Sequence, residues 1–141
     1  MSVYVVDSSV AIKWYVPEVH QPDALRLLGC GVPLHSPDFL DVEVAAVLWK
    51  KLRRGVLTRP DADDILTELL SSAVPVRHPS VPLVADAFDL ADQSGRTVYD
   101  CLYLALAVRL GGRMVTADDK LVNGLAGTAW AAFVMHVRDV P

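Results

Sequence analysis

Short apolar runs and longer amphipathic stretches follow one another along the chain. The β-branched runs predict strands at residues 3–6, around 34–35, and at 74–76, 113–116 and 133–137. Stretches with apolar residues three or four positions apart predict helices at residues 8–14, 23–28, 36–54, 58–70, 80–92, 99–110 and 118–125. Strands that alternate with helices indicate a mostly parallel sheet covered by helices on both faces.

Local signals indicate where several of these helices begin and end. Ser36 is expected to cap the long third helix, with Pro37 in its first turn and Gly55 just past its end. The helix at residues 99–110 is apolar nearly all round, which indicates a buried element. The chain has no internal repeat and no linker-like segment, so residues 1–141 are expected to form one three-layer α/β domain.

Composition supports a single domain and narrows the possible partners. With 141 residues, 52% of them hydrophobic, the chain is long enough to bury its own core. The net charge of -4 lacks the basic excess of a protein that coats nucleic acid. Any contact with nucleic acid is therefore expected to be local or mediated by a metal ion.

The sequence predicts a cytoplasmic protein without membrane contact. Its start lacks the basic region and cleavage site of a secretory signal. The longest apolar stretch, residues 101–108, is too short to cross a bilayer. Cys30 and Cys101 lie far apart without metal-ligand spacing, so both are expected to be reduced thiols.

Four acidic residues stand in apolar surroundings. Asp7 and Asp118 each come just after a predicted strand, Glu43 lies in the long helix, and Asp100 opens the buried helix. Isolated carboxylates are disfavoured in such surroundings unless a partner or a cation keeps them charged. Because ligands of parallel α/β sheets bind beyond the carboxyl ends of the strands, all four acids are expected at that edge.

A cluster of four carboxylates predicts a divalent cation. Two carboxylates about 4 Å apart repel by ~4 kcal/mol at an effective dielectric of about 20, and a cation removes this cost. Oxygen ligands without histidine or cysteine favour Mg²⁺, for which Mn²⁺ can substitute, over zinc. Such a site suits the hydrolysis of phosphodiester bonds.

Four stretches resemble, in family order, the acidic motifs of PIN-domain ribonucleases: VVDSSVAIKW, EVAAVLWK, YDCLYLALAVRLG and MVTADDKL. The short chain is similar to the VapC toxins of bacterial type II toxin–antitoxin systems, and the resemblance runs from about residue 3 to residue 137. It implies a five-stranded PIN-like sheet, Mg²⁺- or Mn²⁺-dependent endoribonuclease activity and a homodimer. It also implies inhibition by an antitoxin peptide laid across the active-site groove.

The resemblance also implies roles for individual residues. Asp7, Glu43, Asp100 and Asp118 match the catalytic acids of the family. Among these, three aspartates match direct metal ligands, and the glutamate is expected to act through a water molecule.

Further residues are expected to support this site. Thr116 and Ser8 match hydroxyl positions that help to order it, and Asp119 is the alternative ligand to its neighbour. Arg96 and Arg113 are expected to contact the RNA backbone, since one precedes Asp100 and the other opens the strand before Asp118.

Each acid also has a simpler structural interpretation. Thr97 and Asp100 form a capping box, and Thr116 with Asp119 forms a second one, in which Asp119 caps and Asp118 stays available for metal. Asp7 could be an ordinary turn residue. Asp41 lies on the same predicted helix as Glu43, and the sequence fixes the orientation of neither.

Two other enzymatic or signalling functions fit the residues less well, and a non-catalytic one remains open. A phosphoacceptor signalling domain needs an acid pair after the first strand and a lone aspartate after a middle strand, whereas Asp7 is single and residues 74–76 lead into Arg77. A phosphatase with an aspartyl nucleophile would need an acid at Ser9. A catalytically inactive PIN-like interaction module would retain the motifs without activity.

Overall fold

Five strands form the centre of the protein. In the computed structural model, which describes residues 2–141, they are ordered β3-β2-β1-β4-β5, and every adjacent pair is parallel. The strands are β1 Tyr4–Val6, β2 Leu34–Pro37, β3 Val76–His78, β4 Arg113–Thr116 and β5 Val134–His136. The predicted five-stranded α/β sheet is confirmed, and it is parallel throughout.

The sheet has a switch point between β1 and β4. The chain moves outward from β1 through β2 to β3, then returns to place β4 on the other side of β1. Crevices at such switch points, beyond the carboxyl ends of the strands, are where ligands of parallel α/β sheets bind. Asp7 follows β1 directly at this point, and its N–H donates to the carbonyl of Val115 in β4 (3.4 Å).

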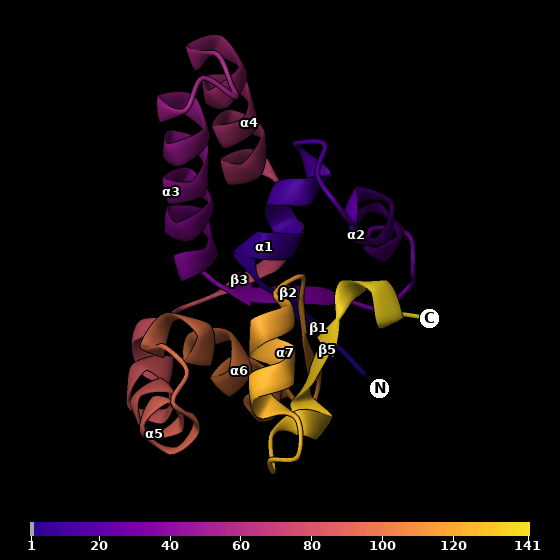
Figure 1. The fold of residues 1–141 in the computed structure, drawn as a ribbon, viewed down its shortest axis with the longest axis vertical. Coiled ribbons are helices and arrows are strands. Elements are labelled where there is room, and N and C mark those ends of the chain that lie inside the picture. The colour runs from indigo at the N-terminus through magenta and orange to yellow at the C-terminus, as the bar shows by residue number, and fades with distance from the viewer. Residues whose placement is uncertain (1) are drawn as a thin grey trace.

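Helices cover both faces of the sheet. They are α1 Ser8–Ala11, α2 Gln21–Leu27, α3 Phe39–Arg53, α4 Arg59–Ser71, α5 Val84–Ser94, α6 Val98–Leu110 and α7 Asp119–Leu125. Short 3-10 turns are η1 Ile12–Trp14, η2 Val81–Leu83, η3 Ala131–Phe133 and η4 Val137–Asp139. In Figure 1 the sheet lies between α1 and α2 on one side and α5, α6 and α7 on the other, while α3 and α4 rise together as a hairpin.

Neighbouring strand residues face different cores. Val5 and Met114 belong to a large cluster with the apolar side chains of α6, whereas Val6 and Val115 belong to a smaller cluster with α1 and α2. Successive side chains of a strand point to opposite faces, so full burial of both Val5 and Val6 requires helices on both sides.

The most buried helix is α6. All seven residues from Cys101 to Ala107 are buried, which confirms the prediction from its uniform apolarity. Cys30 and Cys101 are both free. Within residues 2–141, no helix is long and apolar enough to span a membrane.

The prediction that Ser36 caps the long helix is wrong. Ser36 and Pro37 lie in β2, and the buried Ser36 Oγ has no hydrogen-bond partner among the described residues. Helix α3 begins at Phe39, whose N–H donates to Ser80 Oγ (3.0 Å), and Ser80 Oγ in turn donates to Asp38 (2.6 Å). A residue about forty positions away therefore binds the helix start, a contact that no local signal reveals.

The third strand lies two residues later than predicted, at Val76–His78. Pro75 has no N–H to donate to a strand ladder, so pairing with β2 begins only after it. The helix predicted at residues 80–92 instead starts as the 3-10 turn η2 and continues as α5.

Candidate active site

Asp7 is a buried carboxylate held by three hydrogen bonds. Its Oδ1 accepts from Ser9 Oγ (2.6 Å) and the Val10 N–H (3.2 Å), and its Oδ2 accepts from Thr116 Oγ1 (2.6 Å). Asp7 is itself the N-cap of α1. Both oxygens are therefore fixed in orientation at the switch point of the sheet.

Ser9, rather than the expected Ser8, orders the site together with Thr116. Besides its bond to Asp7, Ser9 Oγ accepts from the Ala117 N–H (2.9 Å) and lies 3.3 Å from Thr116 Oγ1. Ser8 instead faces a groove along α3. The clue to Ser9 is the capping role of Asp7, because the second helical residue lies beside the capping side chain.

Glu43 is held by a tyrosine that sequence reasoning missed. Tyr103 of α6, only 1% exposed, donates its hydroxyl to Glu43 Oε1 (2.7 Å). Burial and the negative charge of Glu43 raise the pKa of Tyr103, so its hydroxyl stays protonated and donates. The available signal was a hydroxyl three residues after Asp100, which places it near that acid on α6.

The choice between Glu43 and Asp41 is also resolved. Asp41 Oδ1 pairs with the guanidinium of Arg77 (3.0 Å), which in turn donates to backbone carbonyls of residues 69, 72 and 75. Asp41 thus belongs to a structural contact between α3 and the α4–β3 connection, whereas Glu43 points toward α6.

Asp100 and Asp118 complete the acidic set from two helix starts. The Asp100 N–H donates to Thr97 Oγ1 (3.0 Å), so the predicted cap of α6 by Thr97 is present. Asp118 is exposed and is the N-cap of α7, its Oδ1 accepting from the N–H groups of Lys120 (2.9 Å) and Leu121 (3.4 Å). Both carboxylates are more accessible to solvent than that of Asp7.

The prediction that Asp119 caps α7 and leaves Asp118 uninvolved is wrong. Asp118 is the cap, and Asp119 Oδ1 lies 2.9 Å from Arg138 Nη2 and 3.6 Å from His136 Nε2. The C-terminal segment therefore binds the second aspartate, which separates the roles of two adjacent acids.

The four acids share one negative region. Burial raises the pKa of Asp7 to about 7, against the bonds from Ser9 and Thr116, and Glu43 raises it further. Burial likewise raises the pKa of Asp100, with further contributions from the charges of Glu43 and Asp118. Each acid thus acts electrostatically on at least one of the others, as expected if the sheet edge gathers them.

The side chains of the four acids do not converge on one point. Within residues 2–141, no three Asp, Glu, His or Cys side chains converge tightly enough to form a metal site on their own. The donor set nevertheless suits a hard cation, since all four groups are carboxylates and Mg²⁺ keeps several of its waters. The raised pKa of Asp7 also fits this cation, because a positive charge beside a buried carboxylate restores its ionised form.

Only one of the two arginines predicted to contact RNA lies near the acids. Arg96 is in the link between α5 and α6, where its positive charge lowers the pKa of Asp100. Arg113 opens β4, pairs in register with Tyr4, and donates from Nε to the carbonyl of Ala132 (3.1 Å). It therefore lies at the amino edge of the sheet, opposite the acids.

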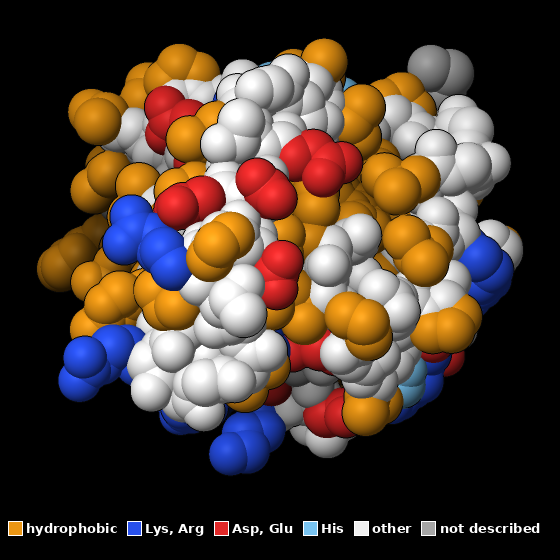
Figure 2. Space-filling model, turned by 90° about the horizontal axis from the view of Figure 1, so that it is seen from above, with side chains coloured by type: hydrophobic (Ala, Val, Ile, Leu, Met, Phe, Trp, Pro, Cys, Tyr) orange, Lys and Arg blue, Asp and Glu red, His pale blue; other side chains and the backbone are white. Residues whose placement is uncertain are grey.

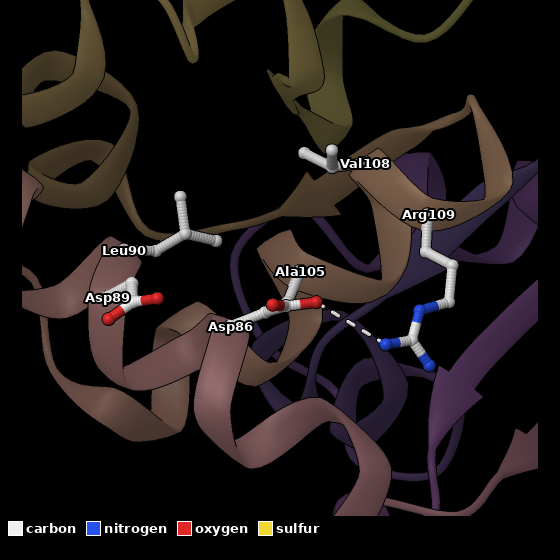
Figure 3. A pocket seen from close by; sticks show the side chains of 6 residues that line it. All are labelled: Asp86, Asp89, Leu90, Ala105, Val108 and Arg109. Atoms are coloured by element: carbon white, nitrogen blue, oxygen red, sulfur yellow. Dashed lines mark hydrogen bonds and ion pairs between the residues drawn. The ribbon is translucent and has the colours of Figure 1, made fainter.

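Two concave surfaces differ in their relation to the acids. A cavity of about 400 Å³ between α5 and α6 contains the Asp86–Arg109 ion pair (3.3 Å) but none of the four acids (Figure 3). A groove of about 330 Å³ along α3 includes Glu43 near one end and Lys50 two turns later, with Tyr99 beside them. The groove, not the cavity, adjoins the candidate site.

Charge is unevenly distributed over the surface seen from above. Acidic side chains run through the centre of this face, and Lys and Arg side chains lie toward its margins (Figure 2). Negative charge therefore dominates the centre of this face.

Comparison with known proteins identifies the family. The model of the PIN domain family matches residues 4–123. Ribonuclease VapC3 of Pyrobaculum aerophilum is 40% identical over 120 residues, which cover 84% of this chain and 92% of that protein. The residues that the family model matches include all four acids.

Solved structures share the fold. The Mycobacterium tuberculosis toxin VapC20, described as cleaving the sarcin-ricin loop, superposes with a TM-score of 0.65 at 20% identity, over 90% of this chain and 97% of its own. VapBC2 of Rickettsia felis, bound to a DNA fragment from its promoter, gives 0.62 at 11% identity, over 95% and 98% of the two chains. This chain belongs to the PIN-domain family and, within it, to the VapC ribonucleases.

Proposed function

We propose that this protein is an endoribonuclease that hydrolyses RNA phosphodiester bonds at the acidic cluster, and that it acts as the toxin of a type II toxin–antitoxin pair. One observation carries the proposal: the buried Asp7 carboxylate is fixed by three hydrogen bonds at the switch point, within electrostatic reach of Glu43. A fixed, partly desolvated carboxylate beside other acids is an arrangement suited to holding a cation.

The proposed cofactor is Mg²⁺, with Mn²⁺ able to substitute. Asp7, Asp100 and Asp118 are the proposed direct ligands, and Glu43 is proposed to act through water. Asp119 is not a proposed ligand, because its carboxylate pairs with Arg138. When bound, the cation supplies Lewis-acid chemistry that activates water and neutralises charge developing on the phosphate.

The protein's own groups orient the reaction. Ser9 and Thr116 keep both oxygens of Asp7 in place. The Tyr103 hydroxyl fixes Glu43 through one oxygen, which leaves the second oxygen to accept a proton from the attacking water. The hydrogen bond from a buried tyrosine also prevents Glu43 from turning away into solvent.

The direct test is cleavage of a single-stranded RNA with Mg²⁺ or Mn²⁺. We expect the parent protein to cleave, and excess EDTA or the double substitution Asp7→Asn, Asp100→Asn to abolish cleavage. Asp64→Asn, on the exposed surface of α4, is the matched control and should cleave normally. Persistent cleavage by the double variant, or in EDTA, would contradict the proposed site.

Calorimetry separates the enzyme from an inactive module. The parent protein should give a heat of Mn²⁺ binding that Asp7→Asn reduces. A purified, partner-free protein without such a heat would instead be a catalytically inactive PIN-like interaction module.

The proposed inhibitor is a cognate antitoxin. An acidic site attracts a basic side chain, and arginine suits it because its guanidinium pairs with carboxylates through two hydrogen bonds. Purification from the native source should yield a complex with this antitoxin that no longer cleaves RNA. Recovery of full activity in such a complex would exclude inhibition at this site.

A cytoplasmic homodimer is also proposed. Val81, Val84 and Phe88 of η2 and α5 are exposed by 83%, 46% and 66%, and exposed apolar groups of this kind mark interaction surfaces. Light scattering should give twice the chain mass, and Phe88→Glu should shift it toward the monomer.

A further inference from the structure

Arg96 is held in a short link beside the acidic cluster. Its N–H donates to Ser94 Oγ at the end of α5 (3.2 Å), and the next residue, Thr97, caps α6. Gly95, at φ +73°, makes the turn between the two helices. The backbone of Arg96 is thus fixed from both sides, four residues before Asp100.

The guanidinium of Arg96 lies against α7 with few protein partners. Its Nη1 donates to the carbonyl of Lys120 at 3.4 Å, and its buried Nε has no partner among the described residues. A guanidinium has five N–H donors, and burying one without an acceptor is unfavourable. The ion pairs found within residues 2–141 include none that joins Arg96 to Asp100 or Asp118. The side-chain hydrogen bonds found within residues 2–141 include none from Arg96 Nη2, so the guanidinium keeps one donor group that the protein does not use.

Gly124 makes room for this guanidinium. A Cβ atom at Gly124 would lie 3.0 Å from Arg96 Cζ, 3.1 Å from Nη1 and 3.3 Å from Nε. Gly124 is not among the glycines with positive φ, so the backbone of α7 does not require glycine there. Glycine is also less favourable than alanine in a helix. The space that it leaves is occupied by the Arg96 side chain.

The position suits an anion that also touches the acidic cluster. The positive charge of Arg96 acts on Asp100 at the start of α6, and its Nη1 donates to the carbonyl of Lys120 in α7. A cleaved RNA strand brings further phosphates next to the one at the metal, and a net charge of -4 does not neutralise them. A guanidinium binds phosphate oxygens through two parallel hydrogen bonds.

We propose that Arg96, seated on Gly124, binds a phosphate of the RNA strand adjacent to the phosphate that is cleaved. This inference rests on the proposed ribonuclease function and adds a substrate-binding residue to it. Arg113, at the opposite edge of the sheet, does not share this role.

The test is the salt dependence of RNA affinity, measured with single-stranded RNA in the non-cleaving Asp7→Asn background. Each phosphate contact adds about 0.7 to the slope of log affinity against log salt for a single strand. Arg96→Gln should lower the slope by about that amount and weaken binding roughly 5-fold near physiological salt. Arg96→Lys should retain most of the slope, and Arg113→Gln should match the background protein.

Gly124→Ala separates binding from a structural role. The added methyl group should favour α7 and displace the guanidinium, so the Tm should be unchanged or higher while RNA affinity falls. In the cleaving parent background, Arg96→Gln should raise KM more than it lowers kcat, as loss of a binding contact does.

Two kinds of failure are distinguishable. An unchanged slope in Arg96→Gln, or an equal loss in Arg113→Gln, would overturn the role of Arg96 while RNA cleavage by the parent stands. If Arg96→Gln lowers the Tm without changing the affinity for RNA, Arg96 serves stability alone and the inference is overturned. Absence of RNA binding and cleavage in the parent would overturn both proposals.

Discussion

The two sides of the acidic cluster are built differently. On the β1 side, Asp7 is 6% exposed, and both of its oxygens accept hydrogen bonds from groups fixed in the core. On the α7 side, Asp118 is exposed, and a single oxygen caps a helix of seven residues. The buried side fixes the location of the acidic cluster, whereas fewer protein groups constrain the exposed side.

This difference has an electrostatic cost on the buried side. Ionised Asp7 loses hydration and faces Glu43, so the carboxyl keeps its proton up to about pH 7 in the absence of metal. Asp118, in contact with solvent, has water to stabilise its charge.

The largest effect is expected from the acids themselves. We expect Asp7→Asn to lower the rate of RNA cleavage by about 10³-fold, because the amide cannot supply the charge that holds the cation. Asp118→Asn should lower it by about 10- to 100-fold, since an exposed ligand is more easily replaced by water. Single-turnover cleavage in Mg²⁺ measures both. Equal losses would mean that burial does not distinguish the two ligands.

The second-largest effect is expected from loss of the Thr116 hydroxyl that donates to Asp7. Thr116→Val removes the hydroxyl that donates to Asp7 Oδ2 while keeping the shape of the buried side chain. Loss of such a supporting contact typically costs about 10- to 100-fold in metal affinity or activity. Thr116→Ser keeps the hydroxyl and should retain most of the Mn²⁺ affinity measured by calorimetry. If serine fails as badly as valine, packing and not the hydrogen bond orders the site.

Stability should depend on pH through the buried side. In EDTA, the raised pKa lets native Asp7 bind its proton up to about pH 7, whereas the unfolded chain releases it near the ordinary aspartate pKa of 3.8. The native state therefore binds more protons between these values, so this group stabilises the protein at low pH and its contribution is lost as pH rises through 7.

Asp7→Asn should remove this dependence. In EDTA, the free energy of unfolding of the variant minus that of the parent should increase by roughly 1–3 kcal/mol from pH 5 to pH 8. Urea denaturation at the two pH values measures it, and Asp118→Asn is the control. Added Mg²⁺ should stabilise the parent more than the variant at pH 8. Parallel pH profiles for parent and variant would contradict the burial of an ionisable Asp7.

The smallest effect is expected from substitution of Asp119, the neighbour of Asp118. Asp119→Asn weakens the contact with Arg138 on the C-terminal segment, and so loosens α7 without removing a proposed ligand. We expect about a 2- to 5-fold lower cleavage rate and a lowering of stability by less than about 1 kcal/mol, typical of an exposed ion pair. A loss as large as that of Asp118→Asn would show that Asp119 also serves the metal.

Much of this molecule follows from local patterns. The alternation of strand and helix signals, the uniform apolarity of α6, and the place of Asp7 after β1 are each set by residues close in sequence. Capping by Thr97 is equally local, because it joins residues three positions apart. Such features depend on backbone geometry and on the periodicity of side chains, which the order of residues specifies directly.

The contacts that complete the site differ from these local features, because they join residues far apart in sequence. The choice of Ser9 over Ser8 depends on Thr116 and Ala117, more than a hundred residues away. Glu43 is distinguished from Asp41 by Tyr103, sixty residues later. The capping role of Asp7 is a local clue to Ser9, but no local rule reveals the distant partners of Ser9 or ranks Glu43 against Asp41, because these residues meet only after the sheet and its helices have packed.

The sequence by itself therefore determined the fold class and which acids could gather at the edge of the sheet. Only the tertiary structure decided that Asp118 caps α7 while Asp119 binds Arg138, and that Arg96 but not Arg113 lies beside the acids. The physical reason is that a side chain's charge and hydrogen bonds depend on its neighbours in space. In a parallel sheet, those neighbours come from distant parts of the chain.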